Sequence, residues 1–171
     1  MIITCARHFE KDAKKEITEI LKQTECKEID VIITEMSGIL FVNSSCDPVE
    51  IIRGLKKIFA DEPWSVRYCL RMIPIHHVIS TNLDEIAEIA KTLEKEMDEN
   101  QKYRITVEKR ECDIPITEII TKIADNISNS VSLEHPDVII LVEIIKDTTG
   151  IALIRPGDIF SLDKSRQSVS E

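Results

Sequence analysis

The residues of this sequence whose type and spacing suggest a binding function are basic. Lysine and arginine side chains at such spacing could bind phosphate groups. They gather in the second half and on the strands flanking it: Lys109, Arg110, Arg71, Arg104, Arg155, Lys102, Lys122 and Arg67. Lys102 and Arg104 are two positions apart on an expected strand, so they share one face. Lys109 and Arg110 come where that strand ends, shortly before a helix expected at Ile116. A strand end beside a helix N-terminus can hold phosphate through side-chain charge and backbone N–H groups.

A second interpretation pairs the same cations with neighbouring acids. The candidates are Glu108, Glu111, Asp113 and Glu118. The formal net charge of −9 also argues against unspecific nucleic-acid binding, which requires neutralised phosphates. Binding nevertheless responds to the local field more than to the total charge. The composition leaves both interpretations open.

Other chemistry finds little support in the sequence. There is no G-x-x-x-x-G-K-[ST] and no G-x-G-x-x-G motif to cradle a nucleotide. His76 and His77 are neighbours on an expected strand, so their side chains point to opposite faces and cannot easily share a metal. No set of nucleophile, base and orienting group can be named. We therefore expect no catalytic residue, no metal and no cofactor.

The cysteines and the apolar segments indicate the compartment. Five cysteines at wide spacings, without a C-x-x-C pair, suggest free thiols rather than a disulfide framework or a zinc site. No apolar run approaches the roughly 20 residues that span a bilayer. The first residues become charged too early, at Arg7, for a signal peptide. These features predict a cytoplasmic protein.

The first 75 residues predict a β-α-β-β-α-β order. Apolar residues recur at helical spacing between positions 8 and 24, and a turn at 35–38 separates two β-branched runs. Asp47 and Pro48 mark the start of a second helix, and Pro63 ends it. A strand over 66–75 completes the pattern. This order is that of a ferredoxin-like domain.

The following segment, residues 76–164, predicts a second, α/β domain. Helices are expected over 83–99 and from Pro115 to Val131, with a strand over 103–109 between them. The run 138–145 is almost continuously apolar, as expected for a strand covered on both faces. A turn at 147–150 leads into a last strand, and residues 165–171 are expected to be a frayed tail.

Several stretches of the second half resemble a THUMP domain. They are the strand Tyr103–Arg110 ending in Lys-Arg, and the turn Leu133-Glu134-His135-Pro136-Asp137 that feeds an apolar strand. Upstream, 67–75 resembles the Arg-x-Ile-Pro segment of THUMP proteins that assist tRNA cytidine acetylation. The resemblance covers roughly residues 66–161. One departure is the segment 111–115, where family members often carry a histidine.

The resemblance implies a function as well as a fold. It implies a non-catalytic adaptor that binds the acceptor stem and 3′ end of tRNA. The adaptor would present this tRNA to a modification enzyme, an N4-acetylcytidine-forming acetyltransferase, with no membrane involved. Because no enzyme domain follows in this sequence, a stand-alone protein is expected. The alternative is a small-molecule-sensing regulatory module, because ferredoxin-like domains also serve that role.

Overall fold

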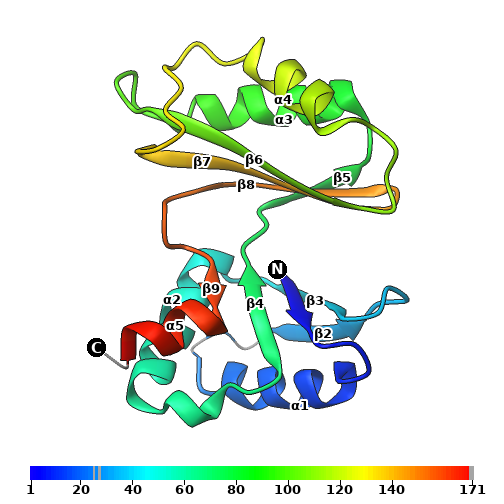
Figure 1. Cartoon of the computed structure of the whole chain (residues 1–171), viewed down its shortest axis with the longest axis vertical. Helices are drawn as coiled ribbons and strands as arrows, with labels where there is room; N and C mark the ends of the chain where they lie inside the picture. The colour runs from blue at the N-terminus through cyan, green and yellow to red at the C-terminus, as the bar shows by residue number, and fades with distance from the viewer. Residues whose placement is uncertain (25, 27, 170–171) are drawn as a thin grey trace. The chain divides into compact units, whose positions relative to one another are not determined.

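The computed structural model describes residues 1–24, 26 and 28–169, which form two compact units. Unit 1 comprises Met1–Pro74 and the chain from Gly157 onward, and unit 2 comprises Ile75–Pro156. Each unit contains one β-sheet with helices packed against it (Figure 1). The mixed α and β fold class predicted from the sequence is therefore confirmed.

Unit 1 begins with the predicted β-α-β-β-α-β order and adds further elements at its end. In chain order they are β1 (Ile2–Cys5), α1 (Glu10–Leu21), β2 (Ile29–Ile33), β3 (Ile39–Ser44), α2 (Pro48–Asp61), the 3-10 helix η1 (Pro63–Ser65), β4 (Cys69–Ile73), β9 (Phe160–Ser161) and α5 (Leu162–Val169). The sheet order is β2-β3-β1-β4-β9, with every neighbouring pair antiparallel. The first four strands have the order of a ferredoxin-like sheet.

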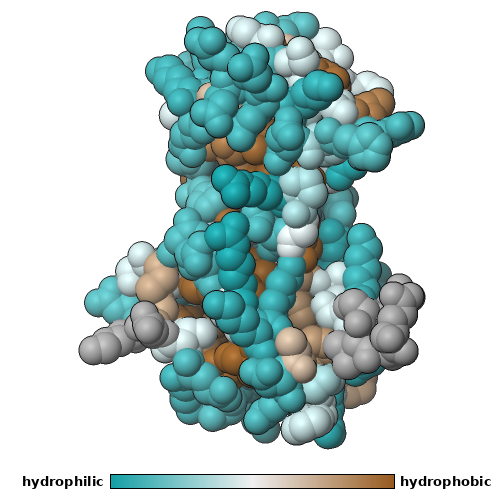
Figure 2. Space-filling view, turned by 90° about the vertical axis from the view of Figure 1, so that its left-hand side faces the viewer, coloured by the Kyte–Doolittle hydropathy of each residue, from teal (hydrophilic) through white to brown (hydrophobic). Residues whose placement is uncertain are grey.

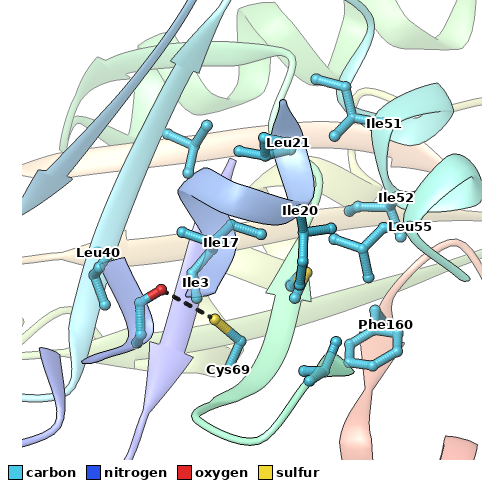
Figure 3. Packing of buried hydrophobic residues seen from close by; sticks show 14 of the residues in the cluster. Ile3, Ile17, Ile20, Leu21, Leu40, Ile51, Ile52, Leu55, Cys69 and Phe160 are labelled. Atoms are coloured by element: carbon cyan, nitrogen blue, oxygen red, sulfur yellow. Dashed lines mark hydrogen bonds between the residues drawn. The ribbon is translucent and has the colours of Figure 1, made fainter. Parts of the chain in front are cut away.

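The core of unit 1 lies between this sheet and helices α1 and α2. Ile3 of the central strand is fully buried, opposite Leu40 of β3 and Met72 of β4. Ile17 and Ile20 of α1 pack onto the same cluster (Figure 3). The thiol of Cys69 donates to the carbonyl of Ala13 at 3.6 Å, which ties β4 to α1. The helical spacing in the sequence thus places its apolar face in this core.

Two local sequence signals fix the ends of elements in unit 1. The Asp47 carboxylate accepts from the backbone N–H groups of Val49 and Glu50, so it caps α2 as predicted. Gly38 ends the β2–β3 turn with φ +79°, and a Cβ there would lie 2.8 Å from the carbonyl oxygen of Cys5. This turn therefore requires glycine.

The end of the chain differs from the expectation. The predicted second domain runs to residue 164 and is followed by a frayed tail, but residues 157–169 belong to unit 1, and residues 170–171 of the expected tail lie outside the described residues. Strand β9 pairs with β4, and the Phe160 ring meets Phe59 edge-on in the core. Arg53 of α2 also pairs with Asp158 at 3.3 Å. The boundary differs because a two-residue strand carries no periodicity that a sequence can reveal.

Cys26 and Cys46 form a disulfide, which corrects the expectation of five free thiols. Their Cα atoms are 6.0 Å apart, although 20 positions separate them in the sequence. The chain leaving α1 returns here beside the start of α2. Spacing alone could not show this proximity, because it depends on how β2 and β3 pair.

Unit 2 has a four-stranded sheet with two helices. Its elements are β5 (His77–Ser80), α3 (Leu83–Glu94), β6 (Tyr103–Arg110), α4 (Ile116–Ala124), β7 (Val138–Ile145) and β8 (Thr148–Ile154). The order is β5-β8-β7-β6, with β6 and β7 parallel and the other pairs antiparallel. Both helices lie on one face of this sheet (Figure 1). All eight residues of β7 are buried, as its continuous apolar run predicts.

Both helices of unit 2 are shorter than predicted. Helix α3 ends at Glu94, and α4 ends at Ala124 rather than at Val131. Beyond α4 the Asn126 side chain donates to the carbonyl of Lys122, which helps to end the helix. The β7–β8 turn is also tighter than expected, because Ile145 already pairs with Thr148.

Candidate nucleic-acid interface

The first residues of β6 are held in place by the segment 130–137. The backbone N–H of Tyr103 donates to Ser130 at 3.0 Å, and its carbonyl accepts from Ser132 at 2.9 Å. The N–H of Lys102 donates to the Asp137 carboxylate at 2.7 Å, and its carbonyl accepts from the Asp137 N–H at 2.8 Å. The buried Tyr103 side chain anchors the strand in the core. Lys102 and Arg104, on either side of Tyr103, are thereby fixed in position.

Arg104 keeps part of its hydrogen-bonding capacity unused at this strand end. Its guanidinium donates to the Leu133 carbonyl at 3.3 Å. Its Nε is buried and has no hydrogen-bond partner among the described residues. Buried donors are almost always satisfied in native proteins, so this unsatisfied Nε is an exception within the described residues. Val131 and Leu133, 56% and 70% exposed, add apolar surface that a base or ribose could contact.

Lys109, the first phosphate-binding residue expected from the sequence, has a structural role in its loop. Its ammonium group donates to the carbonyls of Cys112 at 2.9 Å and Ile114 at 2.8 Å. The loop leads directly into α4, whose N-cap is Pro115 and whose first turn has no side-chain cap. Lys109 therefore lies close to the start of α4, as expected from the sequence. Its ammonium group, however, is hydrogen-bonded to two carbonyl groups of the loop.

Arg110 lies between two carboxylates. It is 3.2 Å from Glu143 and 3.6 Å from Glu108. Glu143 lies on β7 and is fully buried, so its charge needs a close cation. Arg110 supplies such a cation. For Arg110, therefore, the second interpretation of the sequence, in which the cations pair with acids, is the correct one.

Lys122 and Arg155 complete the predicted cations of unit 2. Lys122 pairs with Asp84 at 2.7 Å, linking α4 to α3, and this hydrogen bond raises the pKa of Lys122. Arg155 is exposed and directly follows β8. Lys146, which the prediction omitted, pairs with Glu111 at 3.5 Å. Of the unit 2 predictions, the structure therefore brings together Lys102 and Arg104 at one strand end, and Lys109 and Arg110 at the other.

Arg67 and Arg71 belong to unit 1. The exposed Arg67 donates through Nε to the Trp64 carbonyl at 3.4 Å. Arg71 is half-buried on β4, opposite Thr4 and Ser161. Both residues are placed in a different unit from the other six.

A further group of cations was missed by the sequence reasoning. It lies on the exposed face of α1: Lys11, Lys14 and Lys15, with Arg7 just before the helix. The signal was available, because Lys11 and Lys15 are four positions apart and fall opposite the buried Ala13 and Ile17. It was overlooked because equally many acids are interspersed. On the face seen in Figure 2, hydrophilic side chains cover most of each unit's surface.

The described residues contain no group of three or more potential metal ligands of the His, Cys, Asp or Glu type. No helix in this part of the chain is long and apolar enough to cross a bilayer.

Residues 80–153 match the family model of the THUMP domain. The match runs from the end of β5 into β8, so it covers most of unit 2. The turn that carried the resemblance now has a physical role, since its Asp137 fixes the start of β6. A search of curated proteins finds no significant match to the chain.

Solved structures share the fold across both units. PH1313 from Pyrococcus horikoshii Ot3 has a TM-score of 0.66 at 20% identity, covering 91% of this chain and 55% of its own. TrmN from Thermus thermophilus has a TM-score of 0.54 at 9% identity, with 89% and 44% covered. A 4-thiouridine synthetase in complex with RNA and bound ATP has a TM-score of 0.52 at 13% identity, with 92% and 44% covered. This chain therefore spans about half the length of these proteins or less.

Proposed function

We propose that this chain is an RNA-binding adaptor that holds the acceptor stem and 3′ end of a tRNA. The observation that carries the proposal is the THUMP domain at residues 80–153, with Lys102 and Arg104 fixed at one end of its β6 edge strand. The shared fold with a synthetase that was solved bound to RNA supports the same role.

The proposed interface combines phosphate binding with packing against unpaired nucleotides. The guanidinium of Arg104 and the ammonium of Lys102 bind backbone phosphate oxygens. The exposed Val131 and Leu133 pack against the bases or riboses of the single-stranded end. Single-stranded ends are the part of RNA whose bases proteins can reach, whereas the A-form stem is recognised by shape and backbone.

The role in modification is positional. The adaptor presents the tRNA to a separate enzyme, an N4-acetylcytidine-forming acetyltransferase, which carries out the chemistry. The resemblance of residues 67–75 to the acetylation-associated THUMP proteins supports this choice of enzyme. In this proposal the chain itself contributes no catalytic residue and no cofactor.

The test compares two RNAs and one variant. We expect full-length tRNA to bind more tightly than tRNA trimmed of its 3′ single strand. Replacing both Lys102 and Arg104 by Ala should reduce this difference. It should also make the slope of log affinity against log salt shallower, by about 0.7 for each single-strand phosphate that the variant no longer neutralises. Equal affinity for the two RNAs would place the interface away from the 3′ end. Absence of any tRNA binding by the wild-type protein would refute the adaptor role.

The proposed presentation of tRNA to the acetyltransferase is tested separately, by measuring acetylcytidine formation in the presence of that enzyme. Addition of the chain should increase product, and the Lys102 and Arg104 double variant should increase it less. Acetyl transfer by the chain alone would contradict the non-catalytic role.

A further inference from the structure

We infer that the exposed face of α1 is a second RNA-binding surface, which binds phosphates of the tRNA backbone through Lys11, Lys14 and Lys15. This surface lies in unit 1, outside the THUMP domain. The inference rests on the proposed function in one respect, namely that the anionic partner is RNA.

The acids of α1 point to other parts of unit 1. Glu10 accepts from the backbone N–H of Gly38 at 2.7 Å, from the hydroxyl of Ser37 at 3.1 Å and from the N–H of His8 at 3.2 Å. Glu16 accepts from the backbone N–H groups of 67, 68 and 69, at 2.6 to 3.1 Å. Both carboxylates are therefore held by peptide N–H groups, on the flanks of the helix.

The remaining acids leave the lysines without an ion pair. Glu19 pairs with Lys22 at 2.6 Å. Asp12 lies near the lysines along the helix but forms no ion pair with them. Throughout the described chain, no carboxylate lies within 4.0 Å of the ammonium groups of Lys11, Lys14 or Lys15. All three lysines are exposed.

The position of Lys11 is unfavourable in an isolated helix. The N-terminal end of a helix is positive, so a cation in its first turn, here Lys11, destabilises it, whereas Glu10 and Asp12 in the same turn are favourable. Lys11 and Lys15 are also like charges at i and i+4, which repel each other. In addition, α1 has no side-chain N-cap. Where a sequence departs from local preferences in this way, a functional role is the usual compensation.

The geometry of the face fits a polyanion that lies along the helix. Lys11 and Lys15 are one turn apart, about 6 Å at 1.5 Å per residue, and Lys14 lies beside them. The apolar side of α1 is buried in the core through Ala13, Ile17, Ile20 and Leu21, so only charge is offered outward. A face that offers ammonium groups without apolar anchors suits a phosphate backbone better than a membrane, where amphipathic helices bury their apolar side.

The test uses two matched double variants of the full chain. Lys11→Ala with Lys15→Ala removes a pair at i and i+4 on α1. Lys91→Ala with Lys95→Ala removes an exposed pair of the same spacing at the C-terminal end of α3, where Lys95 is the C-cap, next to Glu88, Glu94 and Glu96. Both change the net charge equally, and Ala favours helix, so both proteins should remain folded. Thermal unfolding followed by circular dichroism checks this.

Binding to full-length tRNA is measured across a salt series. We expect the α1 variant to have a slope shallower by about 0.7 to 0.9 for each phosphate that it no longer neutralises, and the α3 variant to keep the wild-type slope. An unchanged slope in the α1 variant, while the wild type still binds tRNA, would overturn this inference and leave the proposed function intact. Equal reductions in both variants would also overturn it, because they would reflect net charge alone.

Two other outcomes separate the inference from the proposed function. Failure of the wild-type protein to bind tRNA would overturn both together. A parallel assay uses vesicles of phosphatidylserine and phosphatidylcholine. Vesicle binding that depends on Lys11 and Lys15, without tRNA binding, would assign the face to a lipid surface and overturn the RNA assignment.

Discussion

The two units of this protein differ in their balance of basic and acidic residues. By sequence, unit 1 has thirteen basic and fifteen acidic residues, and unit 2 has nine basic and sixteen acidic residues. The unit that matches the THUMP family model is thus the more acidic one. A charge count for each unit would therefore point away from the unit in which we propose the main RNA interface.

The difference lies in what the carboxylates bind. In unit 2, Glu143 pairs with Arg110 and Asp84 pairs with Lys122, so these two cations are already engaged in ion pairs. In α1 of unit 1, Glu10 and Glu16 bind backbone N–H groups, so neighbouring lysines keep their charge available. Available cations therefore depend on the partners of the acids, which the fold determines.

Among the variants that test this comparison, we expect the largest loss of stability when Arg110 is replaced. Arg110→Ala removes the ion pair that Arg110 forms with the buried Glu143 at 3.2 Å, and removing one partner of a buried pair costs about 3–5 kcal/mol. We expect a corresponding fall in the free energy of unfolding, measured by urea denaturation. Adding Glu143→Leu to this variant should recover most of the loss. A urea midpoint equal to that of the wild type would show that the Arg110–Glu143 pair does not contribute to stability.

A smaller effect is expected at Lys109. Lys109→Met removes two charged hydrogen bonds to the loop carbonyls of Cys112 and Ile114, and should lower the free energy of unfolding by roughly 2 kcal/mol. The salt dependence of tRNA binding should stay as in the wild type. Unchanged stability together with a shallower salt slope would instead support the phosphate binding predicted from the sequence.

Much of the fold could be predicted because the signals are local. Helix periodicity, the Asp47 cap and the glycine turn at 38 each act within a few residues, and together they produced the β-α-β-β-α-β order. The buried strand β7 was equally plain from its apolar run. The return of β9 to β4 and the Cys26–Cys46 disulfide could not be predicted, since both join segments that only the sheet brings together.

The candidate site was predicted only in part, for a related reason. The alternation of Lys102 and Arg104 on one strand follows from the sequence. The partner of Arg110, however, is Glu143, which is 33 positions away and adjacent only because β6 and β7 run parallel in register. Of the neighbouring acids considered from the sequence, Glu108 does pair with Arg110, whereas Glu111 pairs with Lys146. Partners across a sheet require the strand register, which no local pattern supplies.

The smallest expected effect concerns Glu10, whose carboxylate keeps the β2–β3 turn beside the start of α1. Backbone N–H groups, its own first and that of Gly38 next, lower the pKa of Glu10 to about 2. A carboxyl whose pKa is lowered by folding contributes stability above its unfolded pKa of about 4.3, and loses it as the pH falls through the folded value. The difference in stability between the wild type and Glu10→Gln should therefore be constant at neutral pH. It should shrink between about pH 4.3 and pH 2 as the wild-type carboxylate becomes protonated. Urea midpoints of both proteins across this range measure the difference. A difference that does not change with pH would mean that the carboxylate charge is immaterial to the turn, and would weaken the argument that Glu10 is withdrawn from the lysines of α1.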